Sequence, residues 1–177
     1  MIIGDPYKFA VMFDEVKSWN YESDCHENGH VALCLDGKMF PNHIVNGIIS
    51  TSLSHVAEKL QNIPEDAELF SMDSAAAFER MYDLVYLYEP DFENDYRFEL
   101  SPEIVSDAEC FAFVVKCGSE VRILGSKLEY DRENSRHIFD GIEVTEIRLD
   151  DSEISDVVKQ IKEYLPTAYE WCRRGNE

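Results

Sequence analysis

The sequence predicts an α+β fold in one domain, residues 1–177, with a mainly antiparallel sheet of about six strands and about three helices packed on it. Short apolar segments separated by turn dipeptides fill the N-terminal part of the chain, as antiparallel strands do. A continuous apolar run follows at 110–115, and an amphipathic stripe covers 154–165. The length of 177 residues suits a single core.

The N-terminal segment predicts the first strand. Phe9, Val11 and Phe13 alternate with smaller or polar residues, which is the period of a half-buried strand. A turn at 4–6 precedes it, because Gly tolerates positive φ and Pro fixes its own φ. We therefore expect this end of the chain to be tied into the sheet.

Two dipeptides predict tight turns that fold the next segments into an antiparallel meander. Asn-Gly at 28–29 is a strong hairpin signal, and a second strand follows over 30–35. Asp-Gly at 36–37 is another hairpin signal. The returning strand begins at 38–40 and is interrupted by Pro41.

Capping residues and apolar spacing predict the helices. The first covers about 52–61 behind a serine cap, and the second begins at 73–74 and ends before Pro90. The third begins at 150–152, where Asp-Asp-Ser provides a cap, and carries the amphipathic stripe. Pro166 is expected to kink or restart this last helix.

The remaining strands are expected in the second half of the chain. The apolar run at 110–115 predicts a central buried strand, and a partner strand follows the turn at 118–119. Residues 129–141 are polar and predict a loop. Residues 142–149 predict another strand, in which a bulge at 145–146 would restore the alternation.

Charge is the unusual feature of the composition. Thirty-six Asp and Glu residues face sixteen Lys and Arg, which gives a formal net charge of −20. Such a chain repels nucleic acid and anionic membranes, so we predict neither as a partner, and it attracts basic surfaces. Solubility or a halophilic source would also account for the charge.

The cysteines and the apolar segments indicate the cellular compartment of the protein. The sequence shows neither a run of 18 apolar residues nor the features of a signal peptide. Five cysteines are an odd number without an export signal, which favours free thiols in a reducing compartment. We therefore expect a cytoplasmic protein.

One short segment matches a zinc-binding motif in residue type and spacing. His26, Glu27 and His30 satisfy H-E-x-x-H, which binds zinc when a helix brings both histidines to one face. Asn-Gly inside the motif disfavours a helix and favours a turn, so we interpret it as an exposed loop, with adventitious metal binding by Cys25 and the histidines as another possibility. The sequence carries no G-x-S-x-G, Walker A or G-x-G-x-x-G pattern. We therefore predict no catalytic, cofactor-binding or metal-binding residues, and no enzyme.

The acidic segment at 89–109 is the better candidate site. Its acidic residues alternate with aromatic residues, and the segment contains a single basic residue, Arg97. Aromatic anchors ringed by charge suit an interface with a basic protein. The other interpretation is that the aromatic residues belong to the core and the acids face water. The contacts that we predict on the first interpretation are Asp91, Glu93, Asp95, Tyr96 and Glu99.

A specific pattern runs through the first 41 residues: M-I-I-G-D-P-Y-K-F-A at 1–10, then Phe13-Asp14, Trp19-Asn20, Asp36-Gly37-Lys38 and Phe40-Pro41. In this pattern the chain resembles the bacterial family called immunity protein forty-two. The resemblance implies an immunity-protein-like domain over 1–177, from a polymorphic toxin or contact-dependent growth inhibition system. It implies no catalytic residues.

What the resemblance implies agrees with the charge. An antidote of this kind would bind a cognate toxin C-terminal domain, expected to be a basic nuclease, and cover its active-site or substrate-binding surface without doing chemistry. Two other hypotheses remain. One is an acidic nucleic-acid mimic that inhibits a DNA- or RNA-binding enzyme, and the other is a zinc-dependent hydrolase that uses His26, Glu27 and His30.

Overall fold

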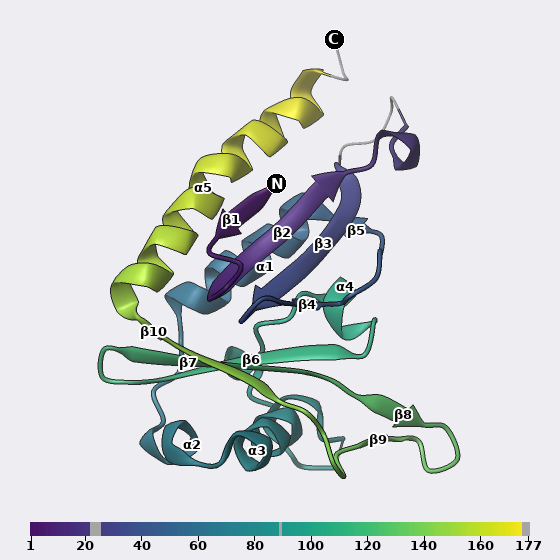
Figure 1. Ribbon diagram of the computed structural model, residues 1–177. Helices are drawn as coiled ribbons and strands as arrows, with labels where there is room; N and C mark the ends of the chain where they lie inside the picture. Colours follow the sequence, from purple (N-terminus) through teal and green to yellow (C-terminus); the bar gives the residue numbers. More distant parts are fainter. Residues whose placement is uncertain (22–25, 89, 175–177) are drawn as a thin grey trace.

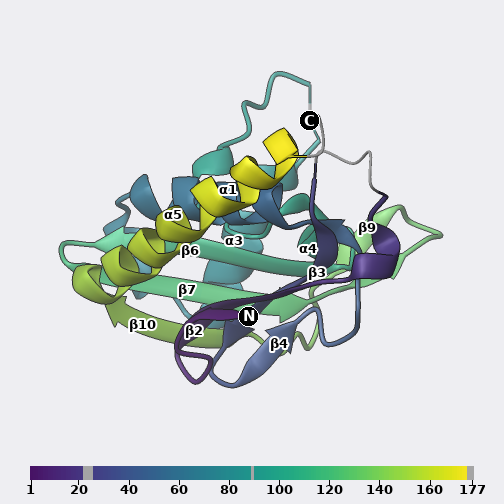
Figure 2. The ribbon, with the colours of Figure 1, turned by 90° about the horizontal axis from the view of Figure 1, so that it is seen from above.

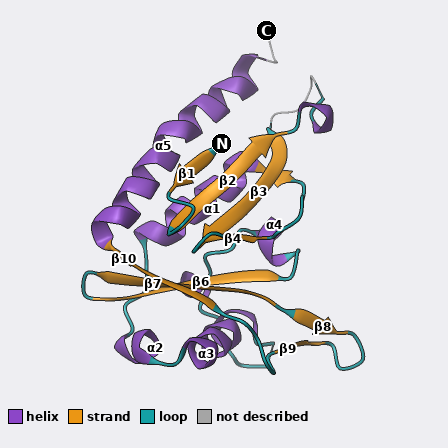
Figure 3. Cartoon of the chain, viewed as in Figure 1, coloured by secondary structure: helices purple, strands orange, loops and turns teal. Residues whose placement is uncertain are grey.

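The computed structural model describes residues 1–21, 26–88 and 90–174, and the side chains as far as Leu165. Figure 1 shows a five-stranded sheet above, with α5 and α1 beside it, and a three-stranded sheet below it. Helices α2 and α3 lie under the lower sheet (Figure 3). The lower sheet therefore separates two helical layers.

The five-stranded sheet is antiparallel and is built from the N-terminal part of the chain. Its strands are β1 (Ile2–Gly4), β2 (Phe9–Glu15), β3 (Asn28–Leu35), β4 (Lys38–Phe40) and β5 (Gly47–Ile48). The order is β1-β2-β3-β4, and β5 also pairs with β3. The predicted hairpin at Asp36 and Gly37 is confirmed, with φ of 49° and 75°, the positive values that a two-residue turn of this kind requires.

The three-stranded sheet is also antiparallel, in the order β10-β7-β6. It consists of β6 (Cys110–Cys117), β7 (Glu120–Lys127) and β10 (Thr145–Asp150), and a separate hairpin pairs β8 (Glu129–Asp131) with β9 (Arg136–Ile138). The helices are α1 (Ile49–Gln61), α2 (Ala67–Ser71), α3 (Ser74–Tyr86), α4 (Glu103–Ser106) and α5 (Asp151–Arg174), with 3-10 turns η1 (Lys17–Trp19) and η2 (Tyr96–Phe98).

Two hydrophobic clusters lie on the two faces of β6. Ala112 and Val114 join the cluster made with the five-stranded sheet, α1 and α5. Phe111, Phe113 and Val115 join the cluster made with α2 and α3. The apolar run is therefore buried on both faces, as predicted, because each face has a core of its own.

The position of β6 within its sheet differs from the prediction. It is an edge strand and not a central one. Its outer edge is closed by loop backbone: the N–H groups of Leu100 and Ser101 donate to Ala112 O, and Lys116 N–H donates to Pro64 O. A run that is buried on both faces does not reveal on which side a strand pairs.

The α+β class with mainly antiparallel pairing is confirmed, and α1, α3 and α5 are the long helices. The expected single sheet is instead divided into separate sheets. Asp73 caps α3 as predicted, accepting from Ala75 N–H at 3.0 Å. Helix α1 starts at Ile49, ahead of the serines proposed as its cap, and α5 is not restarted at Pro166.

The predicted turn at 28–29 is wrong, because both residues belong to β3. Gly29 pairs with Glu15 and Gly47, and a Cβ there would lie 2.2 Å from Asp14 O. Glycine is needed at this position for close backbone approach and not for a turn. Strand β1, which precedes the predicted turn at 4–6, was not predicted.

Two predictions in the second half also need correction. Residues 129–141 contain the β8–β9 hairpin rather than only a loop. Strand β10 pairs with β7 in unbroken register from Thr145–Gly125 to Asp150–Glu120, so there is no bulge at 145–146. The alternation is regular once the strand begins at Thr145.

Candidate protein-binding surface

The acidic loop, defined here as residues 90–99, joins α3 to the segment that closes the edge of β6. Asn94 fixes its middle, because the side-chain Nδ2 donates to the carbonyls of Val85 at 2.9 Å and Leu87 at 3.1 Å. These are carbonyls at the C-terminal end of α3, which need partners from outside the helix. Asp95 N–H donates to Leu84 O at 2.8 Å. The loop is thus fastened to the end of α3 at Asn94 and Asp95.

The end of the acidic loop is held by the core and by α1. Phe98 is buried in the cluster with α2 and α3, as the core interpretation of the aromatic residues expects. Lys59 of α1 donates from Nζ to Tyr96 O at 2.6 Å. The backbone that carries the predicted contacts is therefore positioned from two sides.

Three of the predicted contact residues present free groups to solvent. Asp91 and Glu93 are exposed, and among the described residues neither forms an ion pair with a Lys or Arg. Tyr96 is 54% exposed, and Tyr88, just before the acidic loop, is 98% exposed. Asp91 has a φ of 73°, a region that Asp tolerates better than most residues. Exposed rings and carboxylates therefore share one stretch of chain.

The other two predicted contacts are engaged within the chain. Asp95 accepts from Arg97 Nε at 2.8 Å and from Arg97 Nη2 at 2.6 Å, and the hydrogen bonds from Arg97 lower the pKa of Asp95. Glu99 accepts from the hydroxyl of Tyr86, and burial raises the pKa of Glu99. Their first role is to shape the acidic loop.

The H-E-x-x-H motif does not have the geometry of a zinc site. His30 lies in β3 and its Nδ1 accepts from Val45 N–H at 3.3 Å, while Glu27 accepts from the hydroxyl of Tyr164 at 2.9 Å. The motif is not helical, so its histidines are not brought to one face as the zinc motif requires. Within the described ranges no cluster of three His, Cys, Asp or Glu could hold a metal ion, and Cys25 lies outside these ranges.

The described cysteines are free thiols. Cys34 and Cys110 are buried and Cys117 is partly buried. Burial raises the pKa of Cys110 to about 11, so this thiol stays protonated at neutral pH. Cys25 and the side chain of Cys172 lie outside the described part of the chain.

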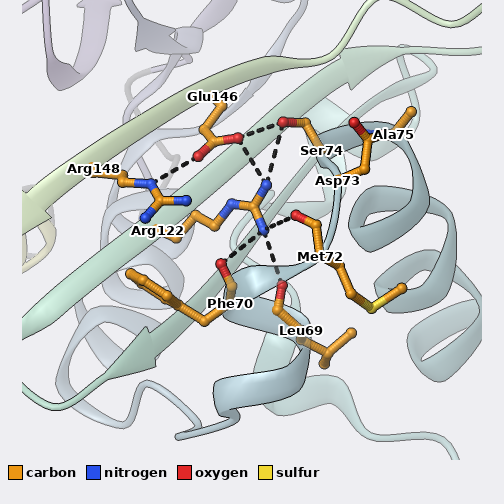
Figure 4. Close-up of polar contacts among 9 residues, drawn as sticks. All are labelled: Leu69, Phe70, Met72, Asp73, Ser74, Ala75, Arg122, Glu146 and Arg148. Atoms are coloured by element: carbon orange, nitrogen blue, oxygen red, sulfur yellow. Dashed lines mark hydrogen bonds and ion pairs between the residues drawn. The ribbon is translucent and has the colours of Figure 1, made fainter.

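A buried guanidinium is the polar feature that sequence reasoning missed (Figure 4). Arg122 of β7 is 1% exposed, and its Nη1 donates to the carbonyls of Leu69 at 2.9 Å, Phe70 at 3.0 Å and Met72 at 2.9 Å. These carbonyls lie at the end of α2, so the cation caps a helix C-terminus from inside the core. An arginine between the apolar residues Val121 and Ile123 was the signal available.

Glu146 of β10 balances this charge. Its carboxylate accepts from Arg122 Nη2 at 2.7 Å, from Ser74, and from Arg148 Nε at 2.9 Å, while Arg148 stacks over the Phe70 ring at 4.8 Å. Burial alone would raise the pKa of Glu146, but the hydrogen bonds outweigh it and bring the pKa to about 2. The Arg122 side chain of this ion pair is shielded from solvent, so we assign the pair a structural role.

A second polar group fastens the β8–β9 hairpin. His137 of β9 contacts the Tyr82 hydroxyl through Nδ1 at 2.5 Å and the Glu109 carboxylate through Nε2. The rings of Phe111 and Tyr130 pack edge-on around this imidazole. Burial, followed by the charge of Glu109, raises the pKa of Tyr82 to about 12, so its hydroxyl remains protonated. The group joins a hairpin to α3 across a long sequence separation.

The acidic loop is therefore a candidate protein-binding surface, carried by an antiparallel α+β scaffold and held in shape by its own polar contacts. None of the helices in the described chain is long and apolar enough to cross a membrane. The chain belongs to the Immunity protein 42 family, whose model matches residues 1–164. The resemblance seen in the first 41 residues is thus confirmed over most of the sequence.

A solved structure gives a second comparison. The chain is similar to the crystal structure of CdiI from Burkholderia dolosa AUO158, with 25% identity and a TM-score of 0.74. The match covers 93% of this chain and 99% of the other. No curated protein matches the sequence. Family and fold together support a toxin-neutralising immunity protein of a contact-dependent growth inhibition system.

Proposed function

We propose that this chain is a non-enzymatic cytoplasmic immunity protein that neutralises one cognate toxin domain by binding it through the acidic loop. The toxin domain is a basic nuclease, and the loop covers its active-site or substrate-binding surface. The observation that carries the proposal is the exposure of Asp91, Glu93 and Tyr96 on a loop whose backbone is held at Asn94 and Tyr96.

Charge and rigidity act at different stages of this binding. The net charge of −20 steers the chain toward a basic surface and raises the association rate, most strongly at low salt. The carboxylates then pair with the Lys and Arg that would hold the nucleic acid backbone. Because Asn94 and Phe98 already order the loop, less conformational entropy is lost on binding.

The contact is specific and not a general mimicry of nucleic acid. Tyr88 and Tyr96 expose large rings beside the carboxylates, and aromatic anchors of this kind recognise particular pockets. A nucleic-acid mimic would use the same charge but bind several unrelated basic nucleases with similar, salt-sensitive affinity. Binding to the cognate domain alone therefore separates the two hypotheses.

Growth rescue tests the function. The C-terminal toxin domain encoded immediately upstream of this gene is expressed with and without the chain, and viable cells are counted. We expect rescue by the wild type, together with a stable complex on a sizing column. Toxicity without rescue would contradict the immunity function itself.

A surface variant tests the site in the same assay. Glu93→Lys combined with Tyr96→Ala should weaken the complex by about 10- to 100-fold, since it removes one charge contact and one aromatic anchor. Asp95 is left unchanged, because its bond to Arg97 shapes the loop. Glu133→Lys, on the β8–β9 loop, is the matched charge control and should keep full affinity. Equal affinity of the double variant and the control would remove the acidic loop from the interface.

A further inference from the structure

A groove of about 590 Å³ lies between the end of α1 and the first half of α5, helices that run side by side in Figure 2. The apolar side chains of Leu60, Ile154 and Val158 line its floor. All three side chains are mostly buried in the hydrophobic cluster made with the five-stranded sheet, α1 and α5, and this packing fixes the floor of the groove. A cavity of this size suits a small molecule.

Three lysines line this groove. Lys116 comes from the end of β6, and Lys159 and Lys162 come from α5. The chain has only 16 Lys and Arg against 36 acids, so its composition does not favour such a gathering. Lys159 and Lys162 are three residues apart on one helix face, where like charges repel. A bound anion would remove that repulsion.

The contacts within the groove leave most of this positive charge available. Lys162 Nζ donates to the neutral Gln61 Oε1 at 3.0 Å, and Lys159 Nζ is 4.0 Å from Glu163. Within the described chain, Lys116 takes part in no ion pair. Asp151 and Glu163 also line the groove, and in sequence they bracket the lysines of α5. A long acidic segment would meet both carboxylates, whereas a small anion would compete only with Glu163, for Lys159.

We propose that this groove binds a small organic anion with an apolar body, of the aromatic or aliphatic carboxylate or sulfonate class. The anionic group sits among the three ammonium groups, and the apolar body covers Leu60, Ile154 and Val158. The site is separate from the acidic loop and does not depend on the toxin-binding proposal.

The probe for the test is 1-anilinonaphthalene-8-sulfonate, which combines a sulfonate with an apolar ring system. We expect one molecule bound per chain, with blue-shifted emission, and amide shifts in NMR confined to the end of α1 and the first half of α5. Lys159→Glu should weaken binding about tenfold or more. Lys17→Glu makes the same charge change on η1, away from the groove, and should change binding less than twofold.

A steric variant tests the cavity without changing charge. Ser155 lines the groove from an exposed helix position, so Ser155→Trp fills the space and should abolish probe binding while growth rescue persists. Several probe molecules per chain, or equal weakening by Lys17→Glu, would overturn the proposal. Loss of rescue in a folded Ser155→Trp variant would also overturn it, because the groove would then belong to the toxin interface.

Discussion

The ionisation of His55, in α1, is coupled to folding. Its Nε2 atom is buried and, within the described chain, has no hydrogen-bond partner. Burial, followed by the charge of Lys59, lowers the pKa of His55 to about 4. The nearby backbone of Glu99 and Ser101 and the charge of Glu58 act in the opposite direction and are outweighed. The imidazole is therefore neutral at pH 7.

The pH dependence of stability follows from this lowered pKa. Between pH 6.5 and 4 the unfolded chain binds a proton at His55 and the folded chain does not, so the free energy of unfolding falls as pH falls. His55→Phe removes this titrating group. The fall in the free energy of unfolding between pH 6.5 and 4 should therefore be smaller in this variant by on the order of 2 kcal/mol. Urea unfolding at several pH values measures it. Equal slopes for wild type and His55→Phe would contradict the assignment.

Single residues also show how far the sequence could predict the site. The exposure of Asp91 and Glu93 agrees with their place in a polar run. The engagement of Glu99 could not be predicted, because Tyr86 reaches it only through the fold, whereas Arg97, the partner of Asp95, lies two residues away in sequence. Gly29 misled the prediction, since Asn-Gly is a local turn signal and the close approach of Asp14 is not visible locally.

At the scale of elements, α2 depends on the buried Arg122. Arg122→Gln leaves the Leu69, Phe70 and Met72 carbonyls and the Glu146 carboxylate without their cation, and should lower the free energy of unfolding by about 3–5 kcal/mol.

Arg148→Gln is the matched control for this prediction, because Arg148 binds the same carboxylate but is half exposed. It should cost less than about 1 kcal/mol. Denaturant unfolding of both variants measures the difference, and similar losses would show that Arg122 does not anchor α2.

Elements with strong local signals were predicted well. The β2 alternation, the hairpin at 36–37, the cap of α3 and the stripe of α5 each lie within one segment of sequence. The division into separate sheets was not predicted, because burial of 110–115 on both faces does not say which strands pair. The β8–β9 hairpin was missed because His137 and Tyr82, which fasten it, are far apart in sequence.

At the scale of the whole molecule, the two faces carry opposite chemistry. The acidic loop presents carboxylates and tyrosines, while the groove between α1 and α5 gathers lysines over an apolar floor. Helix α1 connects them, since Lys59 holds the acidic loop and Leu60 forms part of the groove floor. The proposed toxin contact and the proposed anion site use different side chains, so each can be tested with its own variants on one protein.

In the proposed function the toxin domain binds the acidic loop. Hydrogen exchange by mass spectrometry, on the full chain alone and in complex with the toxin domain, tests it most directly. We expect slower exchange on complex formation to be concentrated in residues 90–99 and at Tyr88, with no change in the first half of α5. Unchanged exchange over 90–99, with protection on another element, would contradict the claim and show where the toxin binds.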